Sequence, residues 1–390
     1  MWTASITVAQ FFFNLKKMEK THKKLTDFDI VKQYKERFER MAQTMQDCVH
    51  HQEGDVYTHT EMVLNELQNL PEYLLLSEYE QKILTYTAIF HDICKPETTE
   101  YLDDTKLRIS HPRHARKGAN LVRQILDKEN YAFDFIEKVY FMVFFHGFPF
   151  HIFDRENPLK EVIKMSLLAN NKWLYIFAKA DLLGRICADH DQMLYQLEMY
   201  REFCLENQVF GEKKVFASDY DRFYYFNQDD SYPDTTLYED YNLDIYLLCG
   251  LPASGKDSYL KTAPKHLKDL PSVHLDALRE EFKISPTDNQ GKIIQISRER
   301  SKEFCRKKQS FIWNATSLTV QIRATLVGIW LPYKPKIHII YLHKNINKIL
   351  TDNYQRKETA QVPTGKILNM FERLEFPNLT EAHEISIIGV

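Results

Sequence analysis

The chain has 390 residues, of which 44% are hydrophobic and 27% charged, and its formal net charge is −3. This length exceeds what one hydrophobic core usually serves, so two domains are expected, and the composition is that of a soluble folded protein. The near-neutral charge excludes nucleic-acid binding through global charge, so any such binding must use local patches.

The cysteines and the apolar runs indicate the cellular compartment of the protein. Six cysteines are scattered without a CxxC pair, and no apolar run approaches the roughly 18 residues of a membrane span. We therefore expect reduced thiols, a cytoplasmic location and no membrane partner. Residues 1–27 start with a mildly apolar stretch that has no basic region before it and no cleavage site after it, which predicts a flexible extension.

Helical periodicity runs almost throughout residues 28–215, where no strand pairs are evident. This pattern predicts an all-α domain. The composition changes at residues 216–243, which are rich in Asp, Tyr and Phe and contain Pro233 but show no periodic spacing of apolar residues. We expect this segment to be a linker, or a lid packed through its aromatic side chains.

Short β-rich runs alternate with helical ones over residues 244–390. The expected strands are Asp244–Cys249, Val273–Leu275, Phe311–Trp313, Lys336–Leu342 and Glu384–Ile388. The expected helices are Lys256–Lys261, Leu275–Phe282, Gly291–Lys308, Thr319–Leu331, Ile346–Tyr354 and Thr364–Arg373. Alternation of this kind predicts an α/β domain with a parallel sheet covered on both faces.

Histidines and acids recur at helix ends in the helical half. The candidate metal ligands are His59, His91, Asp92, His114, His146 and Asp181. Imidazole and carboxylate together suit Mn, Fe, Co, Ni or Zn, and Asp92 beside His91 could bridge two ions that activate water for attack on phosphorus. A single histidine is more often a structural residue with its hydrogen bonds made inside the protein. The prediction of a metal site therefore rests on the ordered set of residues and not on any one histidine.

Two further side chains lie close in sequence to these ligands. Lys95 follows the His91-Asp92 pair by one turn and could bind a substrate phosphate, although a simple cation at a helix end is equally compatible. His111 precedes His114 by three residues, and we include it with Lys95 as a candidate substrate contact.

A phosphate-binding loop is predicted after the first strand, in the sequence Gly250-Leu-Pro-Ala-Ser-Gly-Lys-Asp-Ser258. Successive backbone N–H groups at a helix N-terminus bind polyphosphate oxygens, and the lysine reaches the β and γ oxygens. The candidate contacts are Gly250, Ser254, Gly255, Lys256, Asp257 and Ser258. Asp257 stands where Ser or Thr usually meets Mg²⁺, so Asp257 through water, or Ser258, would serve the ion. The alternative is a strand–turn–helix connection with an exposed lysine.

The second strand ends near an acid and an arginine. Asp276 could accept a proton from an attacking hydroxyl and Arg279 could clamp an acceptor phosphate. A helix-capping Asp with an i,i+3 Arg partner is the alternative. Arg356 ends a later helix and could close over the nucleotide phosphates, whereas solvation at the surface is the simpler explanation for such an arginine.

These motifs carry a family resemblance. The helical half, with His59, His91-Asp92, His114, His146 and Asp181, resembles HD-superfamily metal phosphohydrolases. The second half resembles P-loop 5′-hydroxyl polynucleotide kinases, through the loop ending at Lys256, the Asp276/Arg279 pair and Arg323. Together they resemble the bacterial HD-domain polynucleotide kinase–phosphatases, which are RNA end-healing enzymes.

The resemblance implies two activities. The first half would remove a 2′,3′-cyclic phosphate or a terminal 2′- or 3′-phosphate, using one or two transition-metal ions. The second would transfer the γ-phosphate of ATP, GTP or another nucleoside triphosphate, with Mg²⁺, to a 5′-OH end of RNA or DNA, with Asp276 as general base and Arg323 on the donor phosphate. A separate RNA ligase could then seal the break. The alternatives are a nucleotide phosphohydrolase fused to a small-molecule kinase, and a non-catalytic nucleotide-gated scaffold.

Overall fold

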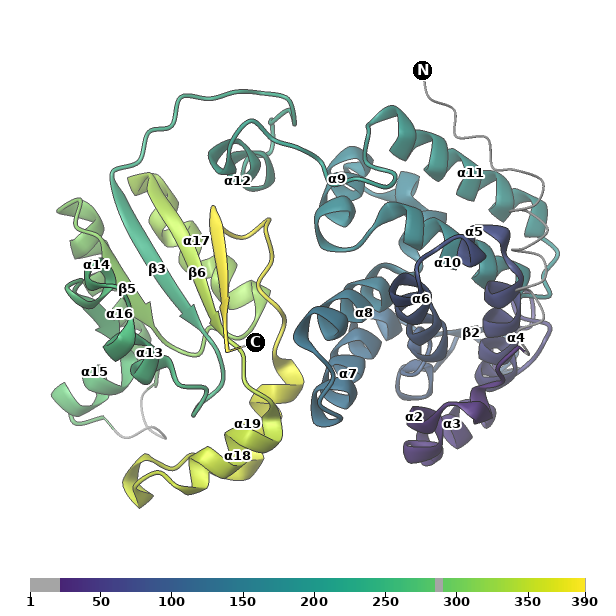
Figure 1. Ribbon diagram of the computed structural model, residues 1–390, viewed down its shortest axis with the longest axis horizontal. Helices are drawn as coiled ribbons and strands as arrows, with labels where there is room; N and C mark the ends of the chain where they lie inside the picture. Colours follow the sequence, from purple (N-terminus) through teal and green to yellow (C-terminus); the bar gives the residue numbers. More distant parts are fainter. Residues whose placement is uncertain (1–21, 285–289, 390) are drawn as a thin grey trace. The chain divides into compact units, whose positions relative to one another are not determined.

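The computed structural model describes residues 22–284 and 290–389 (Figure 1). These residues form two compact units. The first contains the chain up to His114 together with Ile176–Leu197, and the second contains Ala115–Tyr175 with Glu198 onward. The expected boundaries, with residues 28–215 as one domain and 244–390 as the other, stay a prediction.

Helices dominate the amino-terminal half. They are α2 (Asp29–Gln33), α3 (Lys35–Ala42), α4 (Val56–Asn69), α5 (Pro71–Leu74), α6 (Glu78–Phe90), α7 (His114–Lys128), α8 (Phe133–Phe145), α9 (Pro158–Leu168), α10 (Asn171–Leu183) and α11 (His190–Glu206), with 3₁₀ helices at Leu25–Asp27, Lys95–Glu97 and Phe148–Asp154. Their starts follow local chemistry. Asp55 accepts the N–H of Thr58 to begin α4, and Ser77 with Glu80 forms a capping box on α6.

A five-stranded sheet organises the second half. Its strands are β3 (Leu243–Cys249), β4 (Ser272–His274), β5 (Phe311–Asn314), β6 (Pro335–Leu342) and β7 (Glu384–Ile388), all parallel in the order β4-β5-β3-β6-β7. The central strand β3 is almost wholly buried, as its apolar sequence predicts for a sheet covered on both faces. The predicted fold class, a helical domain followed by an α/β domain with a parallel sheet, is confirmed.

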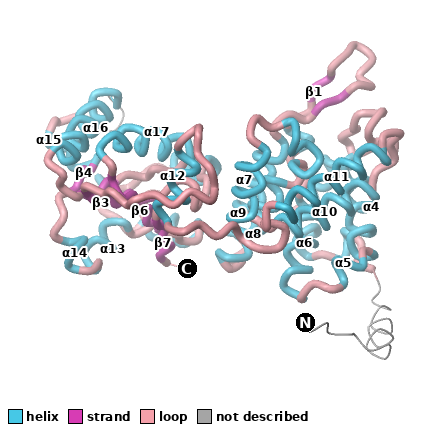
Figure 2. Tube along the Cα trace, turned by 90° about the horizontal axis from the view of Figure 1, so that it is seen from above, coloured by secondary structure: helices cyan, strands magenta, loops and turns pink. Residues whose placement is uncertain are grey.

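Helices cover both faces of this sheet (Figure 2). On one face α13 (Lys256–Thr262) and α14 (Lys265–Lys268) bury Leu248, Ile340 and Leu342 against Leu267. The other face carries α15 (Leu275–Glu281), α16 (Gln290–Arg306) and α17 (Val320–Trp330), where Trp330 packs edge-on against Phe311 of β5. After β6 come α18 (Ile346–Tyr354) and α19 (Thr364–Arg373).

Some local elements differ from the sequence-based expectation. A two-residue antiparallel pair, β1 (Glu100–Tyr101) with β2 (Ile109–Ser110), lies within the segment expected to be helical only. The expected linker contains α12 (Asp219–Asn227), which Ser218 caps. Leu25 is fully buried, so the last residues of the expected flexible extension are packed, whereas residues 1–21 lie outside the described residues. Within the described ranges, no helix has the length and apolarity to cross a bilayer.

Candidate functional site

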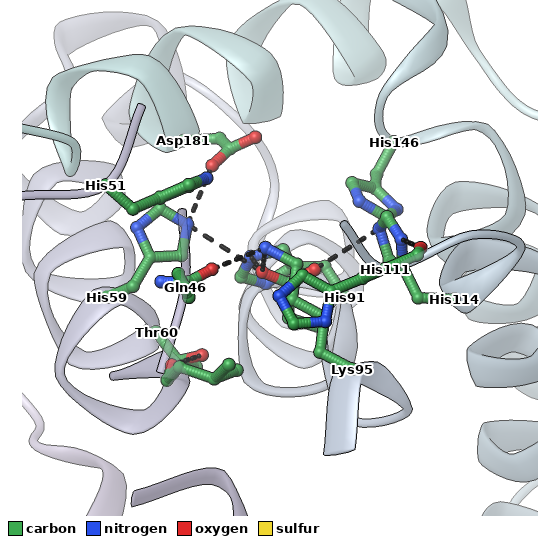
Figure 3. A network of polar contacts seen from close by, with 12 residues as sticks. Gln46, His51, His59, Thr60, His91, Lys95, His111, His114, His146 and Asp181 are labelled. Atoms are coloured by element: carbon green, nitrogen blue, oxygen red, sulfur yellow. Dashed lines mark hydrogen bonds and ion pairs between the residues drawn. The ribbon is translucent and has the colours of Figure 1, made fainter. Parts of the chain in front are cut away.

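Three predicted metal ligands from three helices meet in the first unit (Figure 3). His59 lies on α4, His91 caps the end of α6 and Asp181 lies on α10, and all three are buried. Their ligand atoms lie within 4.8 Å of one another, and His59 Nε2 is 3.0 Å from Asp181 Oδ1. Donors from helices far apart in sequence thus converge at one point, as a metal centre in a helical bundle requires.

Asp92 extends this group toward His114. Its Oδ2 lies 3.1 Å from His91 Nε2 and 3.9 Å from His59 Nε2, while its Oδ1 lies 3.4 Å from His114 Nε2. The two oxygens of one carboxylate therefore face different imidazoles. A bridging carboxylate between two ions would have this arrangement.

Each imidazole in the group has an acceptor at its Nδ1 atom. His91 Nδ1 is 2.9 Å from the carbonyl oxygen of Ala88, and His114 Nδ1 is 2.7 Å from that of His111. His59 Nδ1 lies 3.0 Å from Glu53 Oε1 and 3.3 Å from the carbonyl oxygen of Gly184. Because Nδ1–H donates to these acceptors, the ring proton stays on Nδ1 and the Nε2 lone pair can bind a metal, which is the usual arrangement of metal-binding histidines. The residues present therefore fit a transition-metal centre.

Cations stand beside both carboxylates. Lys95 Nζ is 2.6 Å from Asp92 Oδ2 and also 2.6 Å from Gln46 Oε1, and Arg185 Nη2 is 2.6 Å from Asp181 Oδ2. Burial by itself would raise the pKa of each carboxyl, but the neighbouring positive groups hold the pKa of both Asp92 and Asp181 well below the usual range. Both acids are consequently ionised and able to ligate.

His146 and His111 are the remaining predicted residues of this half. His146 belongs to the second unit, where it caps α8 and its Nδ1 is 2.7 Å from the carbonyl oxygen of Val143, so its place as sixth ligand stays a prediction. His111 Nδ1 is 3.3 Å from Thr99 Oγ1, and its buried Nε2 has no hydrogen-bond partner in the described part of the chain. Burial lowers the pKa of His111 to about 4, so its imidazole is neutral.

The predicted phosphate loop connects β3 to α13. Gly255 has φ +98°, which favours glycine, and a Cβ on Gly250 would come within 2.8 Å of Ser254 Oγ. Lys256 Nζ donates to the carbonyl oxygens of Gly250 and Leu251, at 2.9 and 2.8 Å. Burial lowers the pKa of Lys256 to about 8. Ser254 Oγ is buried without a hydrogen-bond partner among the described residues.

The ends of β4 and β5 bring polar side chains to the same edge of the sheet. Asn314 Nδ2 donates to Asp257 Oδ1 at 2.9 Å. His274 Nε2 lies 3.8 Å from Asp257 Oδ1 and 4.0 Å from Asp276 Oδ2, so both carboxylates flank one imidazole. Arg279 pairs with Asp276, and Ser258 is exposed on α13. Ligands of parallel α/β sheets bind outside this carboxyl edge.

Two cations from the segment after β6 approach the loop. Lys344 Nζ donates to the carbonyl oxygen of Ala253 at 3.3 Å and pairs with Asp352 at 2.9 Å. The positive charge of Arg356 is one of the influences that lower the pKa of Lys256, after burial. Asn353 Nδ2 donates to the carbonyl oxygen of Val362, and Asn353 Oδ1 accepts the N–H of Val362. These two hydrogen bonds connect the ends of the loop that contains Arg356.

Arg323 requires a correction. The resemblance implies a role on the donor phosphate, but the side chain is fully buried and its Nε and Nη2 contact both carboxylate oxygens of Glu381, at 2.7 and 3.1 Å. Its remaining N–H groups donate to the carbonyl oxygens of Ser317, Glu375 and Phe376. Every donor direction is used inside the protein, so this geometry is that of a structural residue.

Sequence reasoning missed the supporting side chains of both sites. Glu53, His51, Gln46 and Arg185 surround the imidazole cluster, and His274 and Lys344 flank the phosphate loop. None of them belongs to a local pattern. Lys344, just past a strand end in the α/β half, could have been found from the rule that ligands meet this edge.

Comparisons with known proteins agree with the division into two kinds of domain. An HD domain model matches residues 56–168 and a model described as an AAA domain matches residues 245–377. None of the curated proteins matches the chain.

Two solved structures resemble part of the chain. A candidate kinase from Chloroflexus aurantiacus j-10-fl has 14% identity and a TM-score of 0.33, over 38% of this chain and 85% of that one. A gluconokinase from Sinorhizobium meliloti 1021 has 16% identity and a TM-score of 0.29, over 39% and 86%. At these values neither likeness bears on the substrate. The family models, with the parallel sheet, show that the chain carries a helical HD domain followed by an AAA domain built on that sheet.

Proposed function

We propose that this protein is a bifunctional enzyme that heals broken nucleic-acid ends. The HD domain removes a 2′,3′-cyclic phosphate or a terminal 2′- or 3′-phosphate, and the kinase-like domain phosphorylates a 5′-OH end. One observation carries the proposal: a single chain holds both an imidazole–carboxylate cluster suited to breaking phosphate esters and a phosphate loop suited to forming one. The two products, a free 3′ end and a 5′-phosphate, are what a ligase joins.

The phosphoesterase half uses His59, His91, Asp92, His114 and Asp181 as ligands, with His146 as the sixth. A divalent transition metal bound there would supply Lewis acidity and lower the pKa of a water molecule. Water then forms a bond to phosphorus while a P–O bond to the 2′ or 3′ oxygen breaks, and that oxygen takes up a proton. Lys95 and His111 are assigned to the substrate phosphate, since both lie beside the ligands.

The kinase half binds Mg²⁺ and a nucleoside triphosphate at the loop. Lys256, Ser254 and the backbone N–H groups bind the phosphates, and Arg356 closes over them. The magnesium ion is held by Asp257 through water, or by Ser258. Asp276 accepts the proton of the 5′-OH as its oxygen bonds to the γ-phosphorus, and the diphosphate leaves with the electrons of the broken P–O bond. Arg279 beside Asp276 binds the acceptor phosphate.

The test is an oligoribonucleotide with a 5′-OH and a 2′,3′-cyclic phosphate, incubated with ATP or GTP, Mg²⁺ and one transition metal at a time. The wild type is expected to process both ends. Lys256→Ala should lose 5′ phosphorylation by at least about 100-fold and retain phosphate removal, and Asp92→Ala should do the opposite and lose bound metal.

Two results would contradict the proposal. Equal loss of both activities in each variant would rule out independent sites. Phosphorylation of free nucleosides at a rate that does not rise with oligonucleotide length would identify a small-molecule kinase instead.

A further inference from the structure

A buried carboxylate outside the predicted ligand set contacts two histidines. The side chain of Glu53 is 1% exposed, and its Oε1 is 2.7 Å from His51 Nδ1 and 3.0 Å from His59 Nδ1. Its Oε2 accepts the backbone N–H of Ile186 at 2.9 Å. These atoms form a group with metal-like spacing, but each carboxylate oxygen already receives hydrogen bonds from inside the protein, so the contacts are those of a supporting residue rather than a second ion site.

We infer that Glu53 is a positioning residue for the metal centre, because its carboxylate keeps the proton of His59 on Nδ1 and directs Nε2 toward Asp92 and Asp181. This inference rests on the metal-dependent half of the proposed function. His91 and His114 have a backbone carbonyl oxygen at Nδ1, whereas His59 has both a backbone carbonyl oxygen and the carboxylate of Glu53 there. A carboxylate at Nδ1 makes the imidazole a stronger metal ligand than a carbonyl does.

The backbone around Glu53 also connects the elements that carry two ligands. Gln52 N–H donates to the carbonyl oxygen of Ile186 at 2.9 Å, and the N–H of Ile186 returns to Glu53. Ile186 lies five residues after Asp181, and Glu53 lies six residues before His59. Glu53 therefore joins the chain before α4 to the chain after α10, and this connection fixes both the ring of His59 and its distance from Asp181.

The experiment titrates metal-free protein with Co²⁺ and follows both affinity and the visible absorption of the bound ion. Glu53→Gln is expected to weaken Co²⁺ binding by about 10–100-fold and to change the absorption spectrum, with the melting temperature of the metal-free protein close to that of the wild type. Asp47→Asn is the matched control. Asp47 is a buried acid in the same stretch that accepts from Arg108 and from the N–H of Ile109 but contacts no ligand, so this variant should bind Co²⁺ like the wild type.

The outcomes separate this inference from the proposed function. If the wild type takes up no Co²⁺, the metal-dependent function fails, and the role of Glu53 fails with it. If the wild type binds Co²⁺ and Glu53→Gln gives the same affinity and spectrum, only the role of Glu53 is overturned, as it is if Asp47→Asn loses as much. Should Glu53→Gln not fold, Glu53→Asp keeps the charge but withdraws the carboxylate, and wild-type affinity in that variant would overturn the inference equally.

Discussion

Buried charges in this protein have two kinds of surroundings. Arg323 is enclosed, with Glu381 and three backbone carbonyls as partners and no exposed surface. Lys95 and Arg185 instead pair with Asp92 and Asp181, carboxylates that also face imidazoles. The first arrangement stabilises the fold, and the second places positive charge beside the candidate metal ligands. A residue type and its spacing do not distinguish these cases, but the partners do.

The surroundings of Arg323 give a prediction about stability. Arg323→Met should lower the free energy of unfolding by about 3–5 kcal/mol, because Glu381 would stay buried without its partner. Denaturant unfolding followed by tryptophan fluorescence measures this change. The double variant Arg323→Met/Glu381→Met should recover part of the loss. A folded Arg323→Met protein of wild-type stability with weakened triphosphate binding would restore the donor-phosphate role instead.

At the scale of elements, the geometry of the candidate metal centre depends on how closely α4 and α10 approach. Gly184 directly follows α10, and a Cβ built on it would lie 2.8 Å from the backbone nitrogen of Val63 on α4. Only glycine permits this separation, since the backbone atoms of a helix cannot move aside cheaply. The same contact brings Asp181 to within 3.0 Å of His59. Helix packing and ligand geometry are therefore set by one residue without a side chain.

Gly184→Ala should separate these helices. We expect a loss of about 1–3 kcal/mol in stability and a weaker affinity for transition metal, measured by denaturant unfolding and Co²⁺ titration. Gly328→Ala on α17 is the control, because a Cβ there meets nothing within 4 Å and the position is exposed. It should raise stability by about 0.5–1 kcal/mol and leave metal binding unchanged. Equal effects of the two substitutions would contradict the packing argument.

Across the whole molecule, several histidines are buried in the neutral form. Burial lowers the pKa of His51 and His383 to about 3 and that of His111 and His343 to about 4. His383 accepts the backbone N–H of Ile337 at its Nδ1, which requires a ring without a proton at that atom. The unfolded chain protonates such residues near pH 6.5, whereas the folded chain does not.

The sign of the pH effect follows from these shifts. Between pH 6.5 and about 4 the unfolded state binds more protons than the folded state, so stability falls as the pH falls, and the loss is complete only below the folded pKa values. At pH 5 each such histidine costs up to about 2 kcal/mol.

Unfolding in urea at pH 7 and pH 5, followed by the fluorescence of Trp313 and Trp330, tests this pH effect in the sheet half. His383→Asn keeps an acceptor for Ile337 but cannot titrate, so its stability should fall less between the two pH values. An unchanged pH dependence in that variant would contradict the assignment.

The sequence alone was enough to predict the two kinds of domain, the five strands, the glycine loop and the candidate metal ligands. The periodicity of apolar residues, the glycines of a turn and the chemistry of a side chain can all be read from neighbouring residues without knowing the fold. The sequence did not predict α12, which lies in an acidic, aromatic segment, or the antiparallel pair of β1 and β2. Only the tertiary structure showed that Arg323 is enclosed by Glu381 and backbone carbonyls, that Glu53 contacts His59 and that Gly184 lies against the backbone of Val63 on α4. Arg323 and Glu381 lie 58 residues apart, and Glu53 meets Ile186 across 133 residues. Contacts between residues so far apart in sequence depend on which surfaces the folded chain brings together, so no local sequence pattern predicts them.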